Sequence, residues 1–267
     1  MRNQTQVGPG STFLEQIVSH VRERVASARV QTPMKQLKNR PLYELPRRDF
    51  ARSLSESGRR IIAEVKRKSP SKGLIREDFD PVAIAKDYAA NGAAALSVVT
   101  EERFFDGSLD SLSAIREEVS LPLLCKDFIV DRYQVVEARS FGADAILLIA
   151  AILGKAELWE LHQHARALSL GTLVEVHTEE ELDNALGAGA QVVGINNRDL
   201  HTFEVDLSVS ERLLRHVPSG VLGVCESGIG SVEYLRRLER SGSHVFLIGE
   251  TLMRAPSPGA KLAELLS

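Results

Sequence analysis

The sequence predicts one α/β domain in which eight parallel strands close into a barrel and a helix follows each strand. Short apolar runs recur about every 20 to 35 residues, and each precedes a segment with helical periodicity, which is typical of repeated βα units. A closed parallel barrel needs eight such units, and the chain offers eight runs with none to spare. Its 267 residues suit one barrel-sized domain.

The chain before the first run predicts a helical extension of this barrel. After a loose leader at Gly8 to Gly10, apolar residues between positions 13 and 25 repeat at helical spacing. A polar stretch with three prolines then predicts an irregular connection with one further short helix. We therefore expect an N-terminal helical extension at 1–59, packed on a (βα)8 TIM barrel at 60–267.

The eight strands are expected at 60–65, 95–100, 121–126, 144–150, 171–176, 191–196, 220–225 and 244–249. Three connections run from a helix end through Gly-Ala into the next strand, and their glycines, Gly92, Gly142 and Gly189, can adopt the left-handed conformation that ends a helix. Helix starts are marked by Asp80 before Pro81, by Asp131, and by Thr178 with Glu181, which have the spacing of a capping box.

An open doubly wound sheet is the alternative fold. That fold usually places a glycine fingerprint after its first strand, whereas this chain has KRKSPSKG there. The closed barrel is therefore the favoured prediction.

Composition excludes several classes of protein. The 33 basic and 36 acidic residues give a net charge of -3, which argues against a nucleic-acid binder that works by bulk positive charge. Cys125 and Cys225 lie inside apolar runs, as expected for core thiols in the reducing cytoplasm. The sequence contains neither a signal peptide pattern nor a long apolar stretch, so we expect no membrane contact.

Charged and polar residues stand at the C-terminal ends of the expected strands, which meet at one mouth of such a barrel. They are Glu64, Lys66, Lys126, Glu175, Asn196, Glu226 and Ser227. Residues two apart on a strand share a face, so Lys126 and Glu175 each continue an interior apolar column. A self-neutralising ion network without catalytic function is the alternative, and Asn196 alone could equally be a backbone cap. Four converging charges favour tuned acids and bases.

A phosphate site is expected on the other side of the mouth. Gly228 follows the seventh strand, and Gly249 with a short helix at 250–254 follows the eighth, where barrel enzymes bind phosphate through backbone amides. Glu250 would contribute its amide while its side chain faces away. The loop after the first strand carries Arg67, Lys68, Lys72 and Arg76, and is expected to form a basic rim and a lid.

Six ordered motifs make the chain resemble the indole-3-glycerol phosphate synthase family. They are IIAEVKRKSPSKG, LPLLCKDFIVDRYQV, LVEVHTEEEL, GINNRDLHTFEVDL, CESGI and LIGETLMR. The resemblance implies a cytoplasmic carboxy-lyase of tryptophan biosynthesis that closes the ring of 1-(2-carboxyphenylamino)-1-deoxyribulose 5-phosphate, with loss of carbon dioxide and water. It implies no cofactor, because the aryl amine nitrogen serves as the electron sink.

The resemblance also implies roles for individual residues. Lys126 would be the general acid at the carbonyl oxygen and Glu175 would assist dehydration, while Lys66 would bind the benzoate or share the acid work. Glu64 would orient or deprotonate. Asn196 and Ser227 would hold the substrate bent, and Ser69 and Arg198 would support it. The aromatic ring of the substrate would pack against Phe105, Phe128 and Leu200. The rest of the substrate and phosphate site is expected from Glu226, Gly228, Gly249 and Glu250.

Two other functions stay open at this point. A strand-end lysine beside a phosphate site also suits a Schiff-base sugar-phosphate aldolase, and an inactive barrel could serve as a binding module. We expect a monomer whose partner is a small phosphorylated substrate. No metal is expected, because His162 and His164 lie two apart on a helix and face different ways, and we expect all seven histidines to be structural or surface residues.

Overall fold

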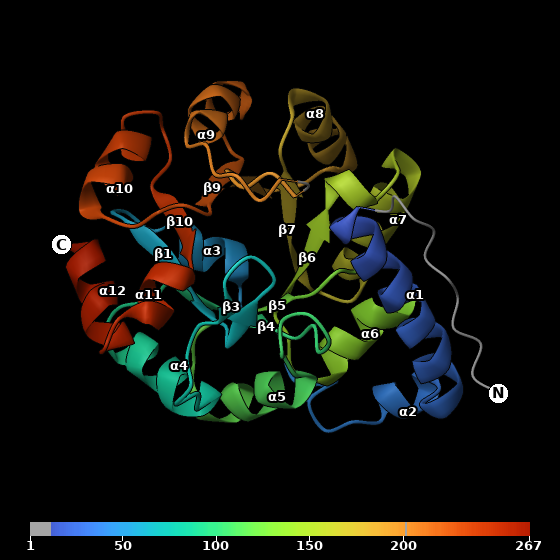
Figure 1. The fold of residues 1–267 in the computed structure, drawn as a ribbon. Coiled ribbons are helices and arrows are strands. Elements are labelled where there is room, and N and C mark those ends of the chain that lie inside the picture. Colours follow the sequence, from blue (N-terminus) through green and yellow to red (C-terminus); the bar gives the residue numbers. More distant parts are fainter. Residues whose placement is uncertain (1–11, 201) are drawn as a thin grey trace.

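Eight parallel strands close into a barrel in the computed structural model, which describes residues 12–200 and 202–267 (Figure 1). The strands are β1 (Arg60–Val65), β4 (Ala95–Val99), β5 (Leu123–Lys126), β6 (Ala145–Ile149), β7 (Gly171–Val176), β8 (Val192–Asn196), β9 (Leu222–Glu226) and β10 (Val245–Ile248). Each strand pairs with its neighbour along the chain, and β1 closes the ring by pairing with β10 from Arg60 opposite Val245. The predicted fold class is confirmed, and each of the eight runs supplies one strand.

Helices surround the barrel and alternate with its strands (Figure 1). They are α4 (Pro81–Ala90), α5 (Leu109–Glu118), α6 (Arg132–Ser140), α7 (Lys155–Ala167), α8 (Glu179–Ala188), α9 (Ser208–Leu213), α10 (Val232–Glu239), α11 (Glu250–Arg254) and α12 (Pro258–Leu266), with 3₁₀ turns η1 (Ala150–Ile152) and η2 (Leu214–His216). The loop after β1 carries a small antiparallel hairpin, β2 (Lys68–Ser69) with β3 (Gly73–Leu74). Within the described part of the chain, no helix is long and apolar enough to cross a membrane.

The predicted helix boundaries are confirmed with one exception. Asp80 and Asp131 cap α4 and α6 through their side chains, and Gly92, Gly142 and Gly189 have φ values of 91°, 91° and 90°. Thr178 caps α8 by accepting from the backbone N–H of Glu181. The predicted capping box is wrong, because the Glu181 side chain does not bond back to Thr178. The Glu181 carboxylate accepts from the backbone N–H of His177, one residue before the cap.

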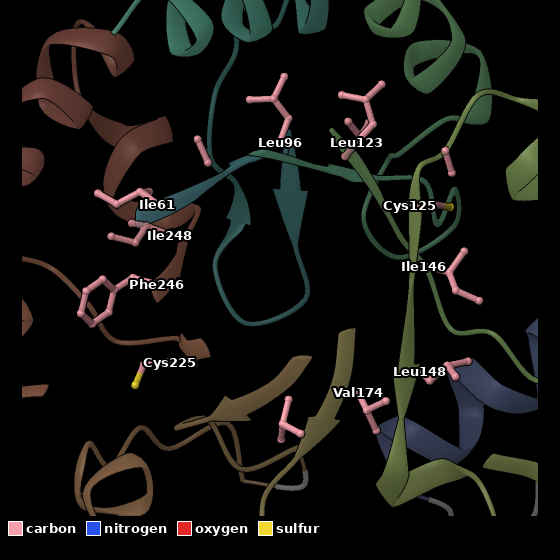
Figure 2. Close-up of a cluster of buried hydrophobic side chains, with 14 of the residues drawn as sticks. Ile61, Leu96, Leu123, Cys125, Ile146, Leu148, Val174, Cys225, Phe246 and Ile248 are labelled. Carbon is pink, nitrogen blue, oxygen red and sulfur yellow. The ribbon is translucent and has the colours of Figure 1, made fainter. Parts of the chain in front are cut away.

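Barrel side chains alternate between two apolar layers. Outward residues such as Ile61 and Leu148 point away from the barrel axis toward the helices, as Figure 2 shows. Inward residues such as Ile62, Leu124 and Leu173 fill the barrel interior. The two cysteines, Cys125 and Cys225, are buried free thiols. Alternation of this kind decides which strand-end residues reach the mouth.

Between residue 12 and the barrel the structure has three helices, namely α1 (Phe13–Gln31), α2 (Met34–Lys38) and α3 (Phe50–Ser55). The connection after α1 therefore holds two short helices rather than the one expected, because Asp49 provides a side-chain cap for α3. The buried face of α1 packs on Tyr133 and Val136 of α6, and Phe50 of α3 joins the interior cluster. The expected leader at Gly8 to Gly10 lies outside the described residues.

Candidate active site

A cavity of about 540 Å³ opens at the C-terminal ends of the barrel strands. This is the size of a small-molecule site. The residues that the sequence singled out for catalysis and for contacts to the substrate and its phosphate, apart from the basic rim, all contribute to its lining: Glu64, Lys66, Ser69, Phe105, Lys126, Phe128, Glu175, Asn196, Arg198, Leu200, Glu226, Ser227, Gly228, Gly249 and Glu250. The structure therefore brings these residues together, and their chemical roles stay predictions.

Lys126 lies at the centre of the charged part of the cavity. Its Nζ donates to Glu175 Oε2 at 3.1 Å and lies 3.6 Å from Glu226 Oε2. Burial by itself lowers the pKa of Lys126, but the charges of Glu175, Glu226 and Glu64 outweigh it and raise the pKa above the ordinary lysine value. The ammonium is therefore protonated at neutral pH and has a proton to donate.

Glu175 is held through both carboxylate oxygens. Oε2 accepts from Lys126, and Oε1 accepts from Asn196 Nδ2 at 3.1 Å. Burial disfavours the charged form, but Lys126 and His177 outweigh it and lower the pKa of Glu175. Glu175 is therefore an ionised carboxylate of fixed orientation.

Glu226 differs from Glu175 because its pKa is raised and not lowered. Burial raises its pKa to about 8, with further contributions from the charges of Glu175 and Glu64, against the attraction of Lys126. Its Oε1 is shielded from solvent and has no hydrogen-bond partner among residues 12–200 and 202–267. At neutral pH the Glu226 carboxyl group can therefore hold a proton, and the remaining Glu64, Glu175, Lys66 and Lys126 charges balance.

Gly194 of β8 makes room for the Glu226 side chain. A Cβ atom at this position would stand 2.0 Å from Glu226 Oε1 and 3.3 Å from Leu173 Cδ1. We expect Gly194→Ala to displace the Glu226 carboxyl group and to lower kcat about tenfold, the scale of losing a supporting contact. A Cβ at Gly187 meets nothing within 4 Å, so Gly187→Ala is the control. Unchanged kcat in Gly194→Ala, with its melting temperature also unchanged, would remove Glu226 from the chemistry.

Lys66 and Glu64 form the second charged pair of the cavity. Lys66 Nζ lies 2.5 Å from Glu64 Oε1. Burial opposes the ionisation of Glu64, but Lys66 and Lys126 outweigh it and lower its pKa. Gly249 clears space for this carboxylate, since a Cβ there would stand 2.3 Å from Glu64 Oε1. The pair therefore adds a second ammonium group to the lining of the cavity.

Two neighbouring asparagines at the end of β8 make different contacts. Asn196 lines the cavity, and its Oδ1 accepts from the backbone N–H of Arg198 at 3.0 Å. Asn197 faces away from the cavity and donates through Nδ2 to the backbone carbonyls of Glu226 and Ser227. Ser227 has φ 63°, an unusual conformation for serine that this clamp supports.

Aromatic rings and the N-terminal helix form the apolar side of the cavity. The Phe105 and Phe128 ring centroids are 6.0 Å apart. Helix α1 adds Phe13, Leu14 and Ile17 to the lining, a contribution that the sequence reasoning missed. Nothing in the local pattern of α1 indicates this wall, because its place depends on how the helix docks.

Arg24 ties α1 to the loop after β5. It pairs with Asp127 at 3.3 Å and with Glu137 at 3.4 Å. Asp127 therefore serves as a partner of Arg24, although it is adjacent to Lys126 in sequence, and its carboxylate also accepts from the backbone N–H of Phe128.

The expected orientation of the Glu250 side chain is wrong. Its carboxylate lies 3.0 Å from Arg254, 3.8 Å from Arg198 and 4.0 Å from Lys72, so it faces three cationic groups that line the cavity. Opposite charges attract this carboxylate into the basic cluster.

Fewer basic residues of the loop after β1 reach the cavity than the sequence predicted. Of the four basic residues in the loop after β1, only Lys72 lines the cavity. Arg67 pairs with Asp106, and Arg76 pairs with Asp78 and donates to the carbonyls of Met253 and Ala255. Except for Asp78, which lies two residues from Arg76, these partners come from other segments and could not be seen in the spacing of the loop.

His177 reaches the charged centre of the site, a contact that the sequence analysis did not single out. Its Nε2 lies 3.7 Å from Glu175 Oε1. Strand parity could have indicated it, because His177 follows Glu175 by two residues. His201 lies outside the described residues, and no group of three or more His, Cys, Asp or Glu side chains in the described ranges could hold a metal ion.

Comparison with known proteins gives relatives along almost the whole chain. The family profile described as indole-3-glycerol phosphate synthase matches residues 14–265. The chain is 50% identical over 256 residues to the indole-3-glycerol phosphate synthase of Salinibacter ruber, with 95% of each chain covered. It is 46% identical over 259 residues to that of Chromobacterium violaceum, with 96% of this chain and 98% of the relative covered.

Solved structures resemble the chain in fold alone. A 3-hexulose-6-phosphate synthase matches with a TM-score of 0.60 and 15% identity, over 77% of this chain and 97% of its own. A thiamine phosphate pyrophosphorylase from Pyrococcus furiosus matches with a TM-score of 0.62 and 15% identity, over 81% and 96%.

Proposed function

The chain belongs to the indole-3-glycerol phosphate synthase family, and from this premise we propose how its cavity carries out the ring closure. The family's enzymes are carboxy-lyases of tryptophan biosynthesis, and the chain acts on a phosphorylated small molecule. The ring carbon that bears the carboxylate attacks the ketone, carbon dioxide leaves, and loss of water completes the indole.

Lys126 is the general acid of the first step in this proposal. As the carbon–carbon bond forms, the ketone oxygen gains negative charge, and the Lys126 ammonium donates a proton to it. The observation that carries this role is the position of Nζ between Glu175 and Glu226, which keeps the amine protonated. Loss of carbon dioxide then restores the aromatic ring.

Glu175 and Glu226 serve the dehydration step. The leaving hydroxyl needs a proton, and Glu226 can hold one at neutral pH because its pKa is about 8. Glu175, ionised and fixed by Lys126 and Asn196, can accept the proton that is lost as the indole forms. Two carboxyl groups with pKa values pushed apart are suited to opposite roles.

Lys66 is proposed to bind the benzoate carboxylate, with Glu64 holding its ammonium in place. Phe105, Phe128 and Leu200 would pack against the aromatic ring, and Asn196 and Ser227 would hold the substrate bent. Ser69 and Arg198 would support it from the rim.

The phosphate is proposed to bind beside Gly228, Gly249 and the basic cluster of Lys72, Arg198 and Arg254. Glu250 now occupies part of that cluster, so an incoming phosphate would replace its carboxylate as the partner of these cations. The hairpin of β2 and β3, which carries Lys72, would act as the lid.

We expect Gly228→Asp to raise KM about tenfold, because a carboxylate a few ångströms from phosphate costs on the order of 1 kcal/mol or more. Gly228 has φ 75° and a Cβ there would stand 2.3 Å from Val205 Cγ1, so a side chain is also strained. Gly230→Asp is the matched control, since a Cβ at Gly230 meets nothing within 4 Å. Equal KM values for wild type and Gly228→Asp would place the phosphate elsewhere.

A direct assay tests the proposed function. Purified protein mixed with the carboxyphenylamino substrate should develop indole fluorescence, and well-folded protein without turnover would contradict the proposal. A Schiff-base aldolase needs an unprotonated lysine that can attack the substrate ketone, whereas the pKa of Lys126 is raised. Borohydride with a sugar-phosphate ketone should therefore leave Lys126 unmodified.

We further propose that the chain works in the cytoplasm as a monomer, and that residues 1–59 extend the barrel of residues 60–267. The α1 side chains in the cavity wall support a role for this extension in closing the site.

A further inference from the structure

His177 is held between two carboxylates at the edge of the charged centre. It follows β7 directly, and its Nε2 lies 3.7 Å from Glu175 Oε1. On its other side, Nδ1 lies 3.1 Å from Glu181 Oε2 of α8, and the His177 backbone N–H donates to the same oxygen at 2.7 Å. Two contacts to one Glu181 oxygen fix both the backbone and the ring.

These neighbours favour the doubly protonated ring. A deprotonated ring nitrogen presents a lone pair, which a facing carboxylate repels, and only the imidazolium presents an N–H on both sides. Nε2 is shielded from solvent, has no hydrogen-bond partner in the described part of the chain, and faces the Glu175 carboxylate at 3.7 Å.

The electrostatic surroundings act in the same direction. The carboxyl groups that act on the ring are Glu175 near the end of β7, Glu181 on α8 and Glu226 on β9. Burial by itself lowers the pKa of His177, but the Glu181 hydrogen bond and the charge of Glu175 outweigh it, so the pKa lies above the ordinary histidine value.

We infer that His177, charged and fixed by Glu181, is a positioning residue that keeps Glu175 ionised and directed at Lys126. His177 is not among the described residues that line the cavity, so it acts through Glu175 rather than on the substrate. The inference rests on the proposed role of Glu175. The Glu181 carboxylate, which belongs to α8 in the helix layer around the barrel, thereby supports Glu175 through His177.

The kinetic test compares His177→Asn with wild type across pH. We expect kcat to fall about tenfold near neutral pH, the scale of losing a supporting partner, with KM unchanged. The ratio of wild-type to variant kcat should shrink as pH rises through the His177 pKa, because the wild-type ring then loses its charge as well. A ratio that is constant with pH, or a variant with wild-type kcat, overturns the inference.

The exposed pair of His216 and Glu179, 3.9 Å apart, provides the control. His216→Asn should leave kcat and KM at wild-type values, and an equal loss in this variant would count against a specific role of His177.

A second measurement follows the ring itself and needs no turnover. In nuclear magnetic resonance titrations, the His177 imidazole should titrate above an ordinary histidine, and Glu181→Gln should lower that pKa and lower kcat in parallel. An unshifted His177 overturns the inference, even if His177→Asn fails to fold. A shifted His177 together with an active Glu175→Gln variant would instead refute the role proposed for Glu175.

Discussion

Replacing Lys126 by alanine is expected to lower kcat at least about a hundredfold, as for the loss of a positioned general acid. No other ammonium lies between Glu175 and Glu226 in the described ranges, so no other described lysine can protonate the ketone oxygen from the same position. KM should change less, because the phosphate and the benzoate keep their own contacts. Turnover is followed by the fluorescence of the indole product.

Two further variants separate acid catalysis from charge and from general damage. Lys126→Arg keeps a positive charge but does not release a proton in proteins, so it should stay nearly as inactive as Lys126→Ala. Lys86→Ala removes an exposed lysine of α4 that pairs with Glu118, and should be fully active. A Lys126→Ala variant within a few-fold of wild-type kcat would exclude the general-acid role.

Replacing Glu175 by glutamine is expected to lower kcat about a hundredfold, again on the scale of general acid–base catalysis. The amide keeps the shape of the side chain and can still accept from Asn196, but it cannot take up a proton and does not stabilise the Lys126 ammonium. The pKa of Lys126 should therefore fall, and the alkaline limit of activity should move to lower pH.

The exposed Glu180 of α8 is the matched control for this change, and Glu180→Gln should behave as wild type. If Glu175→Gln retained full kcat and an unshifted alkaline limit, Glu175 would be only a structural partner of Lys126.

Much of the fold could be predicted because the barrel repeats a local pattern. Glycine at Gly92, Gly142 and Gly189 is needed by the backbone at each helix end, and such needs are visible in sequence. Strand parity also placed Lys126 above Leu124 and Glu175 above Leu173, because alternation is a local property.

The remaining features depend on contacts between distant segments. Phe13 and Ile17 reach the cavity only because α1 docks beside α6. Arg76 does not line the cavity, and its guanidinium instead donates to the carbonyls of Met253 in α11 and of Ala255 just after it. The Glu181 carboxylate followed the capping-box spacing, yet it bonds to His177 instead of Thr178. Competition among such partners is decided by three-dimensional packing, which periodicity does not describe.

A crystal structure with the product indole-3-glycerol phosphate bound tests the central claim most directly. The account predicts the phosphate beside Gly228 and the Lys72, Arg198 and Arg254 cluster, with the indole ring between Phe105 and Phe128 and within reach of Lys126 Nζ. A product that left Lys126 and Glu175 out of contact, or that bound its phosphate away from Gly228, would contradict it.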